Sequence, residues 1–136
     1  MHFCLCVIPQ DRALSKHCGN NVHIVANVLK HWALPAILGQ IMTDIAFLVE
    51  KALLSGNLCI RIFLFCKSGR HRSMAVANIL KHILSKSGPY AVSISHAERR
   101  GWGKLCTYCP DCLSLKPIQS ALDDVARRFP APVSQS

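Results

Sequence analysis

Apolar residues recur at three- and four-residue steps in two stretches of the chain, and this spacing predicts two helices that each bury one face. In residues 36–54 the apolar positions are Ile37, Ile41, Ile45, Leu48, Val49 and Ala52. In residues 72–86 they are Val76, Ile79, Leu80, Ile83 and Leu84. Ser55-Gly56-Asn57 is expected to end the first helix, and Ser73 to cap the second, which ends at Ser87-Gly88-Pro89.

Two short segments on either side of the second helix predict strands. Residues 58–65 are β-branched and aromatic and nearly continuous in apolarity, as expected of an interior strand in a parallel sheet. Residues 90–95 alternate between apolar and polar side chains. Strand, helix and strand in this order form a βαβ unit with a right-handed crossover. We therefore predict a three-layer α/β domain with a short, mainly parallel sheet.

The remaining segments are less regular. Residues 2–8 suit a strand or a poorly ordered start, and residues 22–32 suit either a helix or a strand before Pro35. Residues 117–129 predict a short amphipathic helix, and 130–136 a frayed tail. At 136 residues the chain has the size of one domain, so we expect residues 1–136 to form a single domain in which 1–35 carry no clear assignment.

Charge and cysteine usage narrow the class of protein. The 16 Lys and Arg against 7 Asp and Glu give a formal charge of +9, which favours polyanionic partners such as nucleic acid or phosphorylated metabolites, although a protein can also be merely basic. No apolar run reaches the roughly 18–20 residues of a membrane span, and the N-terminus does not have the pattern of a secretory signal. We expect a soluble, cytoplasmic protein in a reducing compartment, without a membrane partner, whose eight cysteines are thiols rather than a disulfide scaffold.

The segment from Cys66 to Ser73 lies between a predicted strand and a predicted helix and contains Gly69. Backbone N–H groups of such a loop and the positive end of the helix dipole converge on one point, which is an anion-binding arrangement. The expected ligand-binding residues are Cys66, Lys67, Ser68, Gly69, Arg70, His71, Arg72 and Ser73. We expect this loop to bind a phosphate group.

Two roles remain open for Cys66. The spacing Cys-x5-Arg-Ser is similar to the signature of cysteine-dependent phosphatases, in which Cys66 would be the nucleophile and Arg72 the clamp on the phosphoryl oxygens. Such an enzyme also needs a general acid, and none of the candidate aspartates lies in a recognisable loop motif. Alternatively Cys66 is a small buried residue in the wall of the site, which favours binding over catalysis.

The same stretch resembles the C-terminal domain of the RapZ family, the bacterial RNase adapter proteins. The family's loop reads Cys-Thr-Gly-Gly-x-His-Arg-Ser, and this chain has Cys66, one glycine and the His71-Arg72-Ser73 triplet in the same order. The similarity extends over about residues 41–100. His96, after the second predicted strand, matches the family's histidine at that place.

The resemblance implies a RapZ C-terminal-like α/β domain that binds RNA or an amino-sugar phosphate at the Cys66–Ser73 loop and at His96, and that is not known for hydrolysis. No G-x-x-x-x-G-K-[ST] motif occurs in the chain, so the nucleotide hydrolysis of the family's other half is not expected. The acidic, Pro-rich segment upstream of the family's first helix is not recognisable in residues 1–35.

Three cysteines at three-residue steps form a cluster outside the bacterial pattern. Cys106, Cys109 and Cys112 can direct thiolates toward one zinc ion, with His96, Cys4, Cys6, Cys18 or Cys59 as the fourth ligand. Ordinary free thiols are the alternative, and disulfides come third. Zinc within residues 96–112 is therefore a possible cofactor, and a zinc-stabilised protein-interaction module is a third candidate function.

Overall fold

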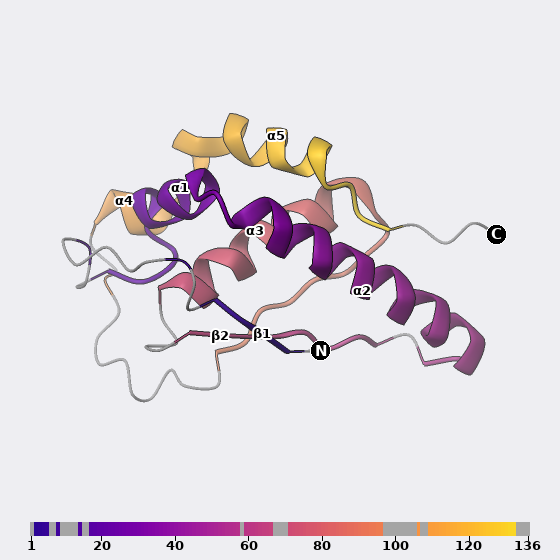
Figure 1. Cartoon of the computed structure of the whole chain (residues 1–136). Coiled ribbons are helices and arrows are strands. Elements are labelled where there is room, and N and C mark those ends of the chain that lie inside the picture. The colour runs from indigo at the N-terminus through magenta and orange to yellow at the C-terminus, as the bar shows by residue number, and fades with distance from the viewer. Residues whose placement is uncertain are drawn as a thin grey trace.

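The computed structural model describes residues 2–5, 8, 14, 17–57, 59–66, 71–96, 106 and 109–132. A short strand precedes two helices, and a second strand precedes the remaining ones (Figure 1). The elements in chain order are β1 (His2–Cys4), α1 (Val22–Lys30), α2 (Leu34–Ser55), β2 (Phe63–Phe65), α3 (Arg72–Ser87), α4 (Pro110–Leu113), the 3-10 turn η3 (Lys116–Ile118) and α5 (Gln119–Arg128).

The two long helices predicted from apolar spacing are confirmed as α2 and α3. Gly56 ends α2 in the left-handed region at φ 75°, a conformation that glycine adopts without steric cost. The segment that suited either a helix or a strand is α1, capped by the side chain of Asn21, and the predicted C-terminal helix is α5. The prediction of Ser73 as the cap of α3 is wrong: the N-cap is His71, and Ser73 lies inside the first turn.

The sheet differs from the predicted one. Strands β1 and β2 pair in parallel, with Phe3 opposite Leu64, and they are the only strands in the described residues. Of the predicted strand over 58–65, only Phe63–Phe65 pairs. Residues 90–95 form no strand, so the second strand of the predicted βαβ unit is wrong. Its alternation is nevertheless real, because Tyr90, Val92 and Ile94 are half-buried and the residues between them are exposed.

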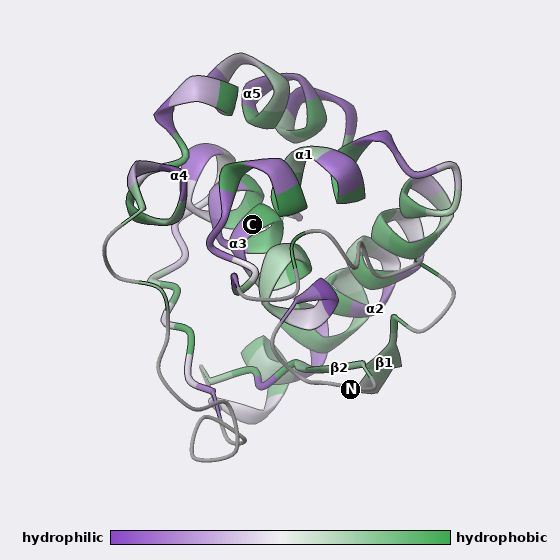
Figure 2. Cartoon of the chain, turned by 90° about the vertical axis from the view of Figure 1, so that its left-hand side faces the viewer, coloured by the Kyte–Doolittle hydropathy of each residue, from purple (hydrophilic) through white to green (hydrophobic). Residues whose placement is uncertain are grey.

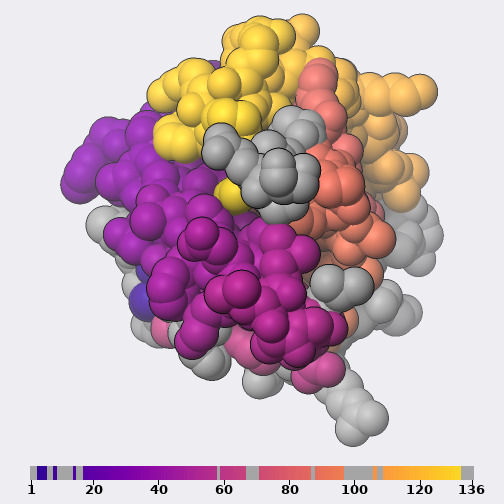
Figure 3. Space-filling view, turned by 90° about the vertical axis from the view of Figure 1, so that its right-hand side faces the viewer, coloured from indigo at the N-terminus to yellow at the C-terminus, as the bar shows by residue number. Residues whose placement is uncertain are grey.

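The 90–96 segment lies at the surface, where it begins beside the chain that follows α5 and then runs toward the side of the sheet (Figures 1 and 3). The hydroxyl of Tyr90 donates to the carbonyl oxygen of Pro132, in the chain that follows α5. Burial raises the pKa of Tyr90 above its ordinary value. Contacts to the helical side of the molecule, rather than ladder hydrogen bonds, therefore account for the period-2 pattern of this segment.

Helices cover one face of the small sheet, as both ribbon views show (Figures 1 and 2). On β2, Phe63 and Phe65 are 50% and 48% exposed, whereas Leu64 packs against the core. The predicted mixture of helices with a short parallel sheet is confirmed. The predicted third layer is not confirmed by the described residues.

Helix α3 is the centre of the core. Residues Ala75, Val76, Ile79 and Ile83 on this helix are completely buried, and α3 packs against α1, α5 and β2. The core cluster also includes buried residues of α1, α2 and α5. Because α3 is covered on several sides, any change at its ends is transmitted to most of the fold.

The segment before α1 lies against the beginning of α3. A Cβ atom added to Gly19 would meet Ala75 N and His71 O at 2.4 Å and Met74 Cβ at 2.6 Å. Nδ2 of Asn78 donates to Gly19 O at 3.0 Å and to Asn20 Oδ1 at 2.9 Å. Only a residue without a side chain fits at position 19, so the contact is set by backbone packing.

Asp123 links α5 to α3. Its Oδ1 atom lies 2.6 Å from Lys86 Nζ and 2.9 Å from His82 Nε2, and it accepts from Gln119 Nε2 at 3.2 Å. The hydrogen bond from Lys86, followed by that from His82, lowers the pKa of Asp123 from 3.8 to about 2. The carboxylate is therefore more acidic in the folded protein than in the unfolded chain.

No single helix in the described part of the chain is long and apolar enough to cross a membrane. Helices α1 and α2, which are bent by 90° relative to each other, reach that length and apolar composition only when they are taken together.

Gly19→Ala is expected to lower the free energy of unfolding by about 1–3 kcal/mol, because the added methyl group overlaps backbone atoms of α3. The matched control is Gly39→Ala in α2, where an added Cβ meets nothing within 4 Å and where alanine stabilises a helix interior by about 0.5–1 kcal/mol. Urea denaturation followed by circular dichroism measures both. Equal stability of the two variants would contradict the close approach.

The stabilisation by Asp123 is expected to depend on pH. Because folding lowers its pKa, the contribution is complete above about pH 4 and is lost as the pH falls toward 2. Asp123→Asn should therefore be less stable than the wild type at pH 6, and the difference in melting temperature should shrink near pH 2.5. Asp124→Asn, at an exposed carboxylate paired with Arg127, is the charge-matched control. A difference independent of pH would contradict the assignment.

Candidate functional site

The candidate site lies where β2 leads into α3. Cys66 follows the last residue of β2, and α3 begins at Arg72, so the predicted order of strand, connection and helix is present. Lys67, Ser68, Gly69 and Arg70, four of the predicted ligand-binding residues, lie outside the described residues. The described part of the site consists of Cys66 and the first residues of α3.

Three polar residues at the start of α3 are buried. His71, Arg72 and Ser73 are only 2%, 7% and 6% exposed, and the first turn of the helix contains no acidic residue. The positive end of the helix dipole therefore lies beside a guanidinium and an imidazole. The first turn of the helix supplies no negative charge to balance the guanidinium.

Arg72 makes a contact that sequence reasoning did not foresee. Its Nη1 atom donates to the carbonyl oxygen of Ile8 at 2.8 Å, in a buried position. This hydrogen bond ties the start of α3 to a residue 64 positions earlier in the chain. A guanidinium has five N–H groups, so Arg72 has a structural role in addition to any role toward a ligand.

Cys66 and Ser73 meet across the connection between β2 and α3. The thiol of Cys66 donates to Oγ of Ser73 at 3.5 Å, and both residues are buried. Their pairing places a sulfur and a hydroxyl at the base of the site. His96, the remaining predicted ligand-binding residue, is half-buried at the end of the extended 90–96 segment.

A second group of chemically active side chains lies between α1 and α4. The imidazole of His17 and the thiols of Cys106, Cys109 and Cys112 place their ligand atoms within 4.8 Å of one another. The three cysteines were predicted to share one ion. The histidine in the group is His17 rather than His96, because the chain brings residue 17 within 3.2 Å of a cysteine 95 residues away. Nothing in the local sequence around His17 indicates this contact.

Asn21 supports this cysteine group from α1. Nδ2 of Asn21 donates to Sγ of Cys112 at 3.3 Å, while its Oδ1 accepts from the backbone N–H groups of His23 and Ile24. The pKa of the Cys112 thiol is raised to about 11, chiefly by burial and also by Cys106 and Cys109, while the hydrogen bond from Asn21 acts to lower it.

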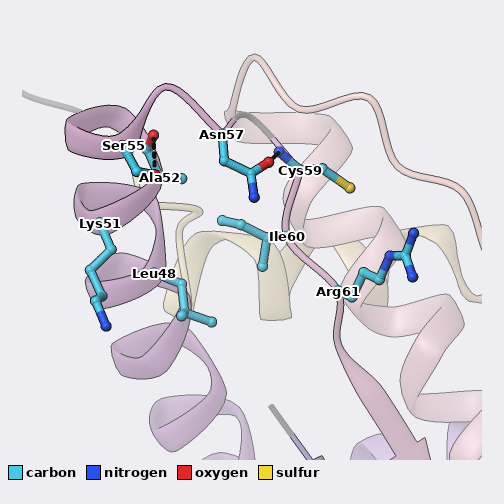
Figure 4. A pocket seen from close by; sticks show the side chains of 8 residues that line it. All are labelled: Leu48, Lys51, Ala52, Ser55, Asn57, Cys59, Ile60 and Arg61. Carbon is cyan, nitrogen blue, oxygen red and sulfur yellow. Dashed lines mark hydrogen bonds between the residues drawn. The ribbon is translucent and has the colours of Figure 1, made fainter.

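An open hollow of ≈ 240 Å³ lies at the other end of β2, between the end of α2 and the residues Asn57, Cys59, Ile60 and Arg61. Lys51 and Arg61 both line it, but their side chains extend in different directions (Figure 4). Arg61 lies before β2 and Cys66 after it, so the hollow is at the opposite end of the strand from the candidate site.

Comparison with known proteins gives one family. The family model of the RapZ C-terminal domain matches residues 8–100. This range includes both sides of the connection between β2 and α3, as well as His17, but it ends before the three cysteines of the second group. No curated protein matched the chain. No solved structure matched it either.

Arg72→Met is expected to lower the free energy of unfolding by about 1.5–3 kcal/mol, because the buried carbonyl of Ile8 loses a charged donor. Arg61→Met removes an exposed guanidinium with the same change in charge and should change stability by less than about 0.5 kcal/mol. Denaturant unfolding of both variants checks this. Two variants of equal stability would show that Arg72 does not hold the N-terminal segment.

Proposed function

Because this chain belongs to the RapZ C-terminal domain family, whose model matches residues 8–100, we propose that it binds a phosphorylated ligand at the Cys66–Ser73 loop. The ligand carries a phosphate group on a sugar or in RNA, and the phosphate is the chemistry that both share. The observation that carries the proposal is the buried His71-Arg72-Ser73 triplet at the start of α3. This triplet is also the part of the loop that resembles the family's most closely.

Electrostatics support an anion at this place. Cationic side chains at a helix N-terminus are unfavourable, because the helix dipole places about half a positive charge there. One such residue, the permanently charged Arg72, is buried beside His71 at the start of α3, whose first turn contains no acidic residue. A bound phosphate would offset this charge through charge-assisted hydrogen bonds.

The proposed assignment of roles follows the chain. Arg72 and His71 supply the charge-assisted contacts, Ser68, Gly69 and Ser73 supply hydroxyl and backbone donors, and Lys67 and Arg70 supply longer-range attraction. Cys66 belongs to the wall, since its thiol is buried against Ser73.

We propose binding without hydrolysis. A cysteine-dependent phosphatase would need the guanidinium of Arg72 as a clamp on the transferring phosphoryl group. In this chain that guanidinium donates to the carbonyl oxygen of Ile8. Because a guanidinium has five N–H groups, this contact leaves Arg72 able to hold a phosphate. The preference for binding without hydrolysis therefore rests on Cys66, whose buried thiol donates to Ser73 in the wall of the site.

Binding is tested by calorimetry with glucosamine 6-phosphate, with unphosphorylated glucosamine as the ligand control. Arg70→Glu should weaken binding of the phosphorylated sugar by about tenfold, because the charge reversal replaces a longer-range attraction by repulsion of the phosphate. Arg61→Glu makes the same charge change at the other end of β2 and should leave the affinity within about twofold. Equal losses in both variants, or equal affinity for both sugars, would refute the phosphate site.

Two further measurements complete the test. The first uses the same two variants to decide whether RNA supplies the phosphate, and the second asks whether the protein hydrolyses a phosphate ester. If RNA supplies the phosphate, affinity for RNA falls steeply with salt, and Arg70→Glu reduces that salt dependence whereas Arg61→Glu does not. Release of phenolate from an aryl phosphate at a rate that depends on Cys66 would contradict the proposal of a binding site without hydrolysis.

A further inference from the structure

We propose that His17, Cys106, Cys109 and Cys112 bind one structural zinc ion. Their four candidate ligand atoms lie within 4.8 Å of one another, and Nδ1 of His17 is 3.2 Å from Sγ of Cys112. In a tetrahedral site with Zn–S bonds of about 2.3 Å and Zn–N bonds of about 2.0–2.1 Å, neighbouring ligand atoms are separated by about 3.5–3.8 Å. The group therefore needs only small side-chain adjustments to surround the ion.

The local backbone already arranges two of the thiols. Cys109 is the N-cap of α4 and Pro110 is in its first turn. The amide of Cys112 donates to the carbonyl oxygen of Cys109 at 3.0 Å. A helical turn places side chains three residues apart on one face, so α4 presents both sulfurs to the same point. Cys106, three residues before Cys109, supplies the third.

The kinds of ligand atom in the group indicate which metal ion it would bind. Three thiolates with one imidazole in a compact group suit zinc, whereas hard cations such as magnesium and calcium prefer oxygen ligands. Four protein ligands complete a tetrahedron and leave no open position for a substrate, which is typical of a structural rather than a catalytic zinc site.

The surroundings also match such a site. Asn21 is 1% exposed and donates from Nδ2 to Sγ of Cys112 at 3.3 Å, which is the kind of contact that orients a metal ligand and stabilises its charge. On the outer side, Nε2 of His23 lies 3.1 Å from a carboxylate oxygen of Asp111. These two contacts join the start of α1 to α4 beside the four ligands.

The site goes beyond the family's phosphate-binding role. Three of its ligands lie after residue 100, where the match to the family ends, and the fourth lies inside the matched range. A zinc ion would therefore tie an addition at the C-terminal side to the family domain. It would also fix residues 17–21, whose Gly19 is in contact with the start of α3.

Elemental analysis of the full chain, expressed with zinc and desalted, is the primary test. We expect about one zinc per chain, falling to below about 0.2 in Cys106→Ser, Cys109→Ser and Cys112→Ser. Cys59→Ser removes an exposed thiol outside the group and should retain the metal. The proposal is overturned if the wild-type protein contains no zinc and a chelator leaves its melting temperature unchanged. It is also overturned if all three cysteine variants contain as much zinc as the wild type.

Histidine variants and cobalt separate ligation from a loss of fold. His17→Cys preserves four ligands and should keep zinc, whereas His17→Ala should lose it or bind it more weakly by at least about tenfold. Wild-type protein loaded with Co²⁺ should show the visible and near-ultraviolet bands of a tetrahedral thiolate complex. Octahedral cobalt spectra, or equal metal affinity of the alanine and cysteine variants, would overturn the assignment. Neither result depends on whether the chain binds a phosphorylated ligand.

Discussion

The fold depends on the close contacts that Ile8, Gly19 and Asn20 make with α3. Gly19 lies so close to this helix that a single methyl group would overlap its backbone. Arg72, from the first turn of the same helix, reaches the carbonyl oxygen of Ile8. Since α3 is also the helix around which the core is built, the N-terminal segment and the candidate site are parts of one packed unit.

The same packing explains which parts of the fold the sequence could predict. Helices α2 and α3 were predictable because their apolar spacing is a local property of each segment. The partner of β2 was not, because β1 lies about sixty residues earlier and contributes only three residues to the ladder. The 90–95 segment has the alternation of a strand, but its half-buried side chains pack without a hydrogen-bonded neighbour strand. Alternation reports one-sided burial, and pairing requires a second strand in register.

The candidate sites also combine features that the local sequence predicts with contacts between distant residues that it does not. The order Cys66, His71, Arg72 and Ser73 could be recognised from the chain alone, since these residues are close in sequence and their burial at a helix N-terminus follows from the flanking elements. The bond from Arg72 to Ile8 could not be predicted. Nor could the position of His17 beside three cysteines, because the contact joins residues 95 positions apart and no motif surrounds the histidine.

Asn21 uses both ends of one carboxamide, and this limits what can replace it. Its oxygen holds the first amides of α1, and its nitrogen points to the sulfur of Cys112. Aspartate, serine and threonine are ordinarily good substitutes for asparagine at a helix start, but none of them offers an acceptor and an amide donor at once. Aspartate would direct an anion at a sulfur, and the hydroxyl residues are too short to span both partners. Position 21 is therefore a place where starting a helix and donating a hydrogen bond to a buried sulfur impose a joint requirement on one side chain.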